Sequence, residues 1–288
     1  MSINTLFDRL YELGLSSRER GQISFFKVAS PHKIFPSKLQ TELLNVFCQI
    51  TDELYDADTS FHWFGKKDYF NTISDIWLVF KEERLIGFSA IRLVDGCGER
   101  IIYVDNMNIK RVSGKVFSHH SIGSILVNEI LQANWRSSLK PVSVVFRTQN
   151  ANVYRLGYSI LPPGTYPRMT AEKARDETRS IRVNSFMANT LSPGKTFIEH
   201  TSIIKQAYSG CIYGSDNKAI QTKRPDIKAF WDSNVDLNNG DAVLISVCPS
   251  RLELIAVIIL YRFDVFKNYL RKVFLRRSIK IISGKQHG

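Results

Sequence analysis

The chain has 288 residues, of which 44% are hydrophobic and 23% charged, so it is long enough for one large globular domain or two modest ones. No apolar run reaches the roughly 18–20 residues that a membrane-spanning helix needs, and the mixed charges of residues 1–21 are not those of a signal peptide. The four cysteines are scattered, without a CxxC pair or histidines at metal-ligand spacing. This distribution of cysteines favours reduced thiols, a cytoplasmic protein and no bound metal.

The net charge of +12 is the unusual bulk property of this sequence. An excess of Lys and Arg favours polyanionic partners, such as nucleic acid, an anionic membrane surface, an acidic carrier protein or a phosphorylated cofactor. Charge alone leaves these alternatives open, although residues 259–288 are rich in basic side chains.

The first part of the chain predicts helices around one strand. Residues 4–14 have the spacing of a short amphipathic helix, and Ile23–Val28 has the composition of a strand that ends before Pro31. Pro36–Leu54 predicts a long helix, and Lys66–Ile73 predicts a shorter one.

A β-rich region follows. Ile76–Phe80, Leu85–Leu93 and Arg100–Ile109 are separated by short polar turns and predict a three-stranded antiparallel meander. A polar loop over Lys110–His120 leads to a predicted helix over Ser121–Asn134.

The next elements are a predicted strand over Pro141–Phe146 and a predicted short helix over Asn150–Leu156. The order β-α-α-β-β-β-loop-α-β-α indicates a mixed sheet with helices on both faces. The chain then shows no clear period until about Phe197.

The last third is predicted from isolated patterns. Helices are expected over Ile198–Tyr208 and Asp226–Trp231, and a strand over Asp241–Val247. Arg251–Arg277 is both apolar and basic and is interpreted as a strand followed by a helix.

The stretch from about Ile76 to Tyr158 resembles the core of the GNAT acyltransferase family, and it is the succession of meander, loop, helix, strand and short helix that carries the resemblance. The resemblance implies an α/β (α+β) protein with a GNAT-like mixed, mostly antiparallel sheet, helices on both faces and a C-terminal extension. Residues 1–160 would form the acyl-CoA-binding core. Residues 161–288 would complete the sheet and end in a basic amphipathic tail.

In that family, the end of the central strand contacts the pantetheine arm of acyl-CoA, which here implies Met107 and Ile109. The next loop has the form Q/R-x-x-G-x-G/A, and its amides hold the pyrophosphate at a helix N-terminus, where free N–H groups and the helix dipole favour an anion. The matching run in this sequence is Ser118, His119, His120, Ser121, Ile122, Gly123 and Ser124. It departs from the pattern because Ser118 replaces Gln or Arg and Ser121 replaces the first Gly.

The resemblance also implies catalytic residues. Asn150 matches an asparagine that meets the cofactor arm just after a strand. Tyr158 is the first candidate for the acid that protonates the departing thiolate, and Tyr154 the second. Asp105 is the candidate general base, with His119 and His120 as fallback bases.

The implied function is transfer of an acetyl or longer acyl group from acetyl-CoA or another acyl-CoA to a small-molecule or carrier-linked amine, without a metal. Three alternatives stay open: a long-chain acyltransferase that uses acyl carrier protein, a non-catalytic GNAT-fold binding module, and a nucleic-acid-associated protein. The last is disfavoured because the sequence shows no recognition helix or stacking motif. The basic apolar residues 263–280 suit peripheral membrane contact or an acidic carrier protein.

Overall fold

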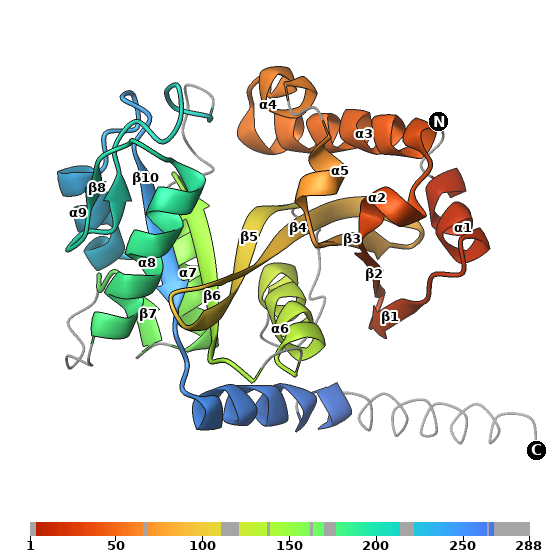
Figure 1. Ribbon diagram of the computed structural model, residues 1–288. Coiled ribbons are helices and arrows are strands. Elements are labelled where there is room, and N and C mark those ends of the chain that lie inside the picture. Colours follow the sequence, from red (N-terminus) through yellow and green to blue (C-terminus); the bar gives the residue numbers. More distant parts are fainter. Residues whose placement is uncertain are drawn as a thin grey trace, which may run out of the picture.

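The computed structural model describes residues 4–65, 68–110, 121–136, 139–161, 164–169, 177–213, 222–263 and 265–267, and its described strands form one sheet (Figure 1). The sheet order is β1-β2-β3-β4-β5-β6-β10-β9-β8, and β7 also pairs with β10. The strands are β1 (Ser17–Arg20), β2 (Ile23–Ala29), β3 (Asp75–Lys81), β4 (Arg84–Gly96), β5 (Glu99–Ile109), β6 (Val142–Thr148), β7 (Thr165–Tyr166), β8 (Phe197–Ile198), β9 (Ile203–Ile204) and β10 (Ala242–Val247).

Helices cover both faces of this sheet, as expected. They are α1 (Asn4–Glu12), α2 (Pro31–Ile34), α3 (Ser37–Tyr55), α4 (Ser60–Phe64), α5 (Tyr69–Thr72), α6 (Ile122–Asn134), α7 (Ala151–Ile160), α8 (Thr178–Leu191) and α9 (Pro225–Asn234). Residues 251–263 and 265–267 are helical too, and we call them the C-terminal helix.

The alternation of buried side chains along each strand assigns the helices to faces. On one face, α6, α7, α9 and the C-terminal helix pack on a core that runs from β2 to β10. On the other face, helices α1 to α5 cover β2 to β4, whereas α8 covers β5, β6 and β10. The second face therefore carries two separate groups of helices, and the sheet is open between them.

The pair β5–β6 is the one parallel pair among the described strands, and it is also where the sheet divides. Ala90 pairs with Asn106 and Ile91 pairs with Val104, so Asp105 is an extra residue in a β-bulge. The pairing of β5 with β6 ends at Val104 and Phe146. Because a bulge bends its strand, the ends of β5 and β6 beyond this point diverge.

Several sequence-based expectations are corrected. The helix expected over Lys66–Ile73 is shorter than predicted, since its described residues are helical only over Tyr69–Thr72 (α5), and residues 66–67 lie outside the described part. Helix α4 was not expected. The helix expected over Ile198–Tyr208 is wrong, since this segment contains the end of β8 and all of β9. Helix α8 was not expected. The strand expected at the start of Arg251–Arg277 is wrong, since residues 251–263 and 265–267 are helical.

Candidate active site

A cavity of about 720 Å³ opens where β5 and β6 diverge. Its lining comes from four segments: residues 51–63 of α3 and α4, residues 104–110 of β5, residues 146–153 of β6 and α7, and residues 208–213. The divergent strands supply polar backbone on two sides, and helices from distant parts of the chain supply side chains on the others. This combination is typical of a ligand-binding site.

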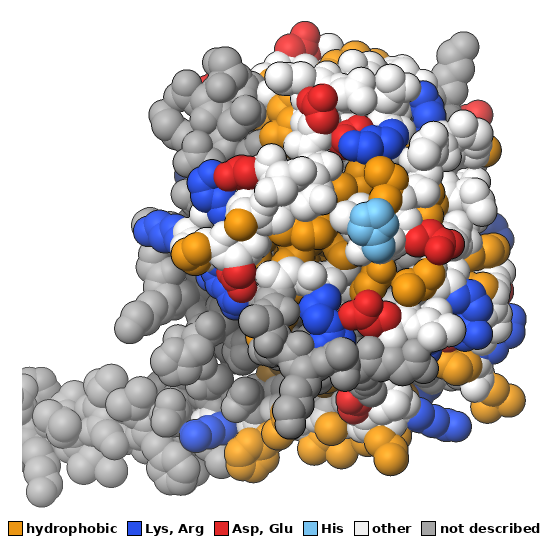
Figure 2. Space-filling view, turned by 90° about the vertical axis from the view of Figure 1, so that its left-hand side faces the viewer, with side chains coloured by type: hydrophobic (Ala, Val, Ile, Leu, Met, Phe, Trp, Pro, Cys, Tyr) orange, Lys and Arg blue, Asp and Glu red, His pale blue; other side chains and the backbone are white. Residues whose placement is uncertain are grey.

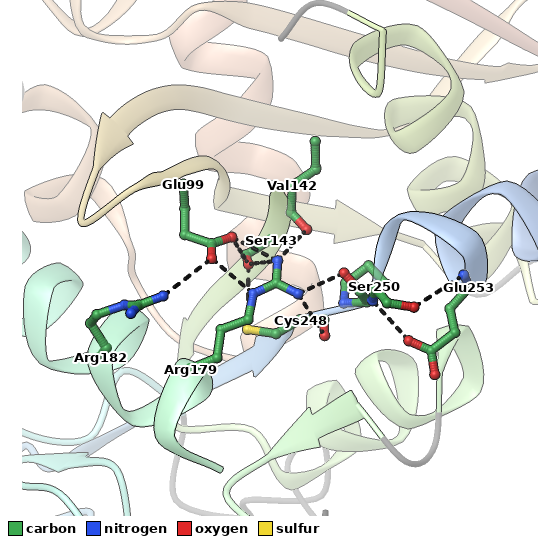
Figure 3. A network of polar contacts seen from close by, with 9 residues as sticks. Glu99, Val142, Ser143, Arg179, Arg182, Cys248, Ser250 and Glu253 are labelled. Atoms are coloured by element: carbon green, nitrogen blue, oxygen red, sulfur yellow. Dashed lines mark hydrogen bonds and ion pairs between the residues drawn. The ribbon is translucent and has the colours of Figure 1, made fainter. Parts of the chain in front are cut away.

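At the start of the paired part of β5 and β6, before the strands diverge, an ion pair with a buried carboxylate joins the sheet to α8 (Figure 3). The Glu99 carboxylate, at the start of β5, accepts hydrogen bonds from Nε and Nη2 of Arg179 on α8 at 2.8 and 2.7 Å. Ser143 of β6 donates to the same carboxylate at 2.9 Å. Arg179 also donates to the carbonyl of Pro249 at 2.8 Å, which joins the chain after β10 to this point.

The β5 side of the cavity contains Asp105, Met107 and Ile109, all expected from the sequence to lie in the site. The Asp105 carboxylate pairs with Arg92 at 3.0 Å and accepts a hydrogen bond from Asn106 Nδ2 at 2.9 Å. Its side chain is only 6% exposed, so the bulge holds an ion-paired carboxylate at the cavity wall. A catalytic role for Asp105 stays a prediction.

On the β6 side, Asn150 lines the cavity as expected and caps α7. Its Oδ1 accepts from the amide of Asn152 at 2.9 Å, and its side chain is also a hydrogen-bond partner of the Tyr213 phenol. An asparagine is favoured there because its side chain satisfies an N–H group of the first helical turn.

The preceding residue, Gln149, is fully buried and builds the opposite wall. Its Nε2 donates to the carbonyls of Gly210 and Asp241, both at 3.1 Å, and its Oε1 accepts from the amide of Ile212 at 2.9 Å. These bonds hold the segment that carries Tyr208 and Tyr213 against the end of β6.

Three tyrosines form an aromatic wall: Tyr55 from α3, and Tyr208 and Tyr213. The rings of Tyr55 and Tyr213 lie 4.6 Å apart, and the Tyr55 hydroxyl donates to Asn108 Oδ1 at 2.7 Å. Burial raises the pKa of both Tyr55 and Tyr213, so each phenol stays protonated at neutral pH and can donate a hydrogen bond.

Arg147 lines this cavity and forms no ion pair in the described part of the chain, although the Asp105 carboxylate attracts it from a greater distance. Its Nη1 donates to Ser192 Oγ at 3.1 Å, its guanidinium lies 4.9 Å from the centre of the Tyr208 ring, and its Nε is buried without a hydrogen-bond partner. The other charged lining residues are paired: Asp105 with Arg92, and Glu53 with Lys110 at 2.5 Å. Arg147 is therefore a lining cation whose guanidinium is not held by a carboxylate ion pair in the described part of the chain.

The N-terminus of α6 lies beside the β5 wall. Ser121 caps this helix, with its Oγ accepting from the amide of Ser124 at 3.1 Å. A Cβ added at Gly123 would be 3.8 Å from Met107 Sδ and from Leu156 Cδ1. The first amides of α6, at Ile122 and Gly123, therefore lie behind Met107, which lines the cavity, and a helix has free N–H groups there to offer an anion.

The remaining expected site residues are placed differently. Ser118, His119 and His120 lie outside the described residues. Tyr154 is buried, and its hydroxyl accepts from the amide of Met169 at 3.2 Å. Tyr158 stacks on Tyr154 with ring centres 6.2 Å apart. Neither tyrosine is among the residues that line the cavity, and their catalytic roles stay predictions.

Sequence reasoning missed Arg147, Gln149, Tyr208 and Tyr213. Gln149 and Arg147 belong to the Arg147–Tyr158 run that was considered, but their side chains act through segments distant in sequence. Tyr208 and Tyr213 have no local signal, because their position depends on the contacts with Gln149.

No protein-family profile and no curated protein matches this chain. Solved structures with a similar arrangement include ElaA from Escherichia coli, with 13% identity over 54% of this chain and 94% of that chain and a TM-score of 0.36. Naa50 from Arabidopsis thaliana, in complex with the bisubstrate analogue CoA-Ac-MVNAL, has 11% identity over 78% of this chain and 97% of that chain, with a TM-score of 0.35. An aminoglycoside acetyltransferase from an uncultured soil metagenomic sample has 10% identity over 54% and 93%, with a TM-score of 0.33.

These superpositions are weak, so the assignment of the fold rests on topology. The observed succession β3-β4-β5-α6-β6-α7 is the one that the GNAT resemblance predicts. The fold is GNAT-like. In the described part of the chain, no helix is both long and apolar enough to cross a lipid bilayer.

Proposed function

We propose that this protein is an N-acyltransferase that moves an acetyl or longer acyl group from acyl-CoA to an amine by direct attack. The observation that carries the proposal is the cavity between the divergent ends of β5 and β6, with the α6 N-terminus close to Met107 of its wall. The pantetheine arm would lie between Met107, Ile109 and Asn150. The pyrophosphate would lie on the first amides of α6.

In the proposed reaction, the neutral amine attacks the thioester carbonyl, and a backbone N–H near Ile109 stabilises the oxyanion. Collapse of the tetrahedral intermediate breaks the C–S bond, and the thiolate takes a proton. Asp105 is proposed to remove the proton from the amine, directly or through water. Tyr158 is assigned as the acid by the family resemblance, whereas Tyr213 is a protonated phenol in the cavity wall, beside Asn150.

The direct test measures release of free CoA with a thiol reagent, using acetyl-CoA, a long-chain acyl-CoA or acyl carrier protein as donor and a panel of amines. Tyr158→Phe and Tyr213→Phe identify the acid, since its loss lowers kcat while affinity for the donor is kept. CoA binding without any thiol release would favour the non-catalytic module. Turnover with acyl carrier protein alone would replace CoA as the donor.

The variant Gly123→Ala is expected to change the affinity for CoA and the stability of the fold in opposite directions. The folded protein has room for the added Cβ, and alanine favours a helix over glycine by about 0.5–1 kcal/mol, so the melting temperature should rise. The same methyl group would hinder close approach of a phosphate to the backbone. We therefore expect CoA affinity, measured by calorimetry, to fall about tenfold, or about 1.4 kcal/mol. Unchanged affinity in the more stable variant would place the pyrophosphate elsewhere.

Arg147, which forms no ion pair in the described part of the chain, supports a proposal for the class of acceptor. A guanidinium pairs best with a carboxylate or phosphate, so we propose that the acceptor carries such a group near its amine. With acetyl-CoA as donor, amino acids should be acylated with a kcat/KM about tenfold or more above that of their methyl esters.

Arg147→Gln should remove this preference by raising the KM of the amino acid, while the KM of acetyl-CoA stays the same. The matched control is Lys110→Gln, because Lys110 also lines the cavity but is already paired with Glu53. Equal use of amino acids and esters by the unaltered enzyme would rule out this acceptor class and leave the acyltransferase proposal standing.

A further inference from the structure

The C-terminal helix is anchored to α6 by one of its faces. Leu254, Ile258 and Tyr261 on that face are buried in the core. The Tyr261 hydroxyl donates to Glu129 Oε1 at 3.0 Å, and Arg262 Nε donates to Gln132 Oε1 at 2.9 Å. The orientation of the helix on the domain is therefore fixed, so its other face points consistently away from the core.

That other face is apolar and exposed. The exposed fractions are 80% for Leu252, 58% for Ile259, 65% for Leu260, 62% for Phe263 and 56% for Phe266. With about 100° between successive residues of a helix, Leu252, Ile259, Phe263 and Phe266 fall within about 60° of one another. We call these four residues and Leu260 the apolar stripe. In Figure 2, hydrophobic side chains gather along the lower edge of the molecule, at the level where Figure 1 places the C-terminal helix.

Three cations lie on the described part of the helix that carries the apolar stripe. Arg251, Arg262 and Lys267 are exposed on the same helix. The sequence from residue 265 to residue 288 contains no Asp or Glu. Its basic residues are Lys267, Arg271, Lys272, Arg276, Arg277, Lys280 and Lys285.

The chemistry of this surface selects one occupant. Nucleic acid would pair with the cations but would leave Phe263 and Phe266 in water. A second copy of the chain would cover the apolar side chains but would bring like charges together. An anionic lipid surface satisfies both requirements, because headgroups pair with Lys and Arg while the acyl boundary takes up the apolar side chains.

We propose that the C-terminal helix is a docking surface for an anionic membrane, with the helix axis in the plane of the interface and the apolar stripe inserted below the headgroups. This arrangement does not depend on the acyltransferase proposal, since the stripe shares no residue with the cavity. It would hold the domain at a bilayer reversibly, by charge and apolar burial together.

The test is co-sedimentation of the full chain with vesicles. Vesicles of phosphatidylcholine and phosphatidylglycerol in equal parts should retain the protein about tenfold or more strongly than vesicles of phosphatidylcholine alone, and high salt should weaken the retention. Similar retention by both vesicle types, or by neither, would overturn the proposal.

The decisive variant is Ile259→Ser/Phe263→Ser. Both side chains are mostly exposed, so the melting temperature should be unchanged while retention on the anionic vesicles falls about tenfold. The matched control is Phe64→Ser, because Phe64 is 54% exposed on α4, at the opposite end of the molecule in Figure 1. Equal losses in the two variants would contradict the assignment to the stripe. A dimer in sedimentation that the double serine variant abolishes would assign the stripe to a second copy instead.

Discussion

Replacing Glu129 with alanine is expected to lower the free energy of unfolding by about 3 kcal/mol. The Glu129 side chain is fully buried on α6, with its oxygens 2.5 Å from Arg20 Nη2 and 2.9 Å from Arg18 Nη1. Removing a buried charge leaves its partners unpaired, which costs about 3–5 kcal/mol. We take the lower end of that range because Arg18 is 47% exposed and water screens it. Urea unfolding followed by circular dichroism measures the loss.

Two controls isolate the buried carboxylate. Arg18→Ala should cost less than about 1 kcal/mol, because water replaces an exposed guanidinium at little cost. Glu42→Ala removes the partly exposed partner of Arg9 and should be similarly mild. If Glu129→Ala, Arg18→Ala and Glu42→Ala lowered the free energy of unfolding by the same amount, the burial of Glu129 could not be the cause of the loss. Because Tyr261 also donates to Glu129, Glu129→Ala should in addition loosen the C-terminal helix and expose it to proteases.

Much of the sheet could be predicted from local patterns. The strands β2 to β6 alternate or run apolar between clear turn residues, and α3 and α6 have regular helical spacing. Asn150 and Met107 line the cavity, and each sits at the end of a strand whose position the pattern defines; their roles in cofactor binding stay predictions. The family order then related these local elements to one another.

The errors have a physical cause. Ile203 and Ile204 form a strand because they pair with Val243 and Ala242, about forty positions later, which no local pattern can show. Helix α8 was not predicted because its buried face includes Ser180 and Asn184, which weaken the hydrophobic periodicity of the sequence. Asn184 is tolerated there because its Nδ2 donates to Ser202 Oγ and to the carbonyl of Leu244.

The site was only half predictable for the same reason. Its β5 wall is a property of one strand and its bulge, but its opposite wall is assembled by Gln149 from residues about sixty positions away. Gly240 illustrates the tightness of that assembly, since a Cβ there would lie 2.0 Å from the carbonyl oxygen of Tyr208. A side chain that acts through such contacts leaves no recognisable pattern in the sequence around it.

The ion pair between Glu99 and Arg179 gives the second large expected effect on stability. Arg179→Leu is expected to lower the free energy of unfolding by about 3–5 kcal/mol, because it leaves Glu99, 1% exposed, without its bidentate partner. Ser143 would remain as an uncharged donor, and Arg182, which is 56% exposed and 3.8 Å from the carboxylate, would remain as a partner screened by water. The loss should appear as a lower midpoint in urea with an unchanged slope.

The double variant Glu99→Leu/Arg179→Leu gives the sharper result. With both charges gone, no carboxylate is stranded, so this variant should be about 2 kcal/mol more stable than Arg179→Leu alone. A double variant that is less stable than Arg179→Leu would show that Glu99 is satisfied without the arginine. The comparison also bears on function, since Glu99 and Ser143 join β5 to β6 where the two strands still pair. If the cavity depends on that junction, CoA affinity should fall in Arg179→Leu and recover, at least partly, in the double variant.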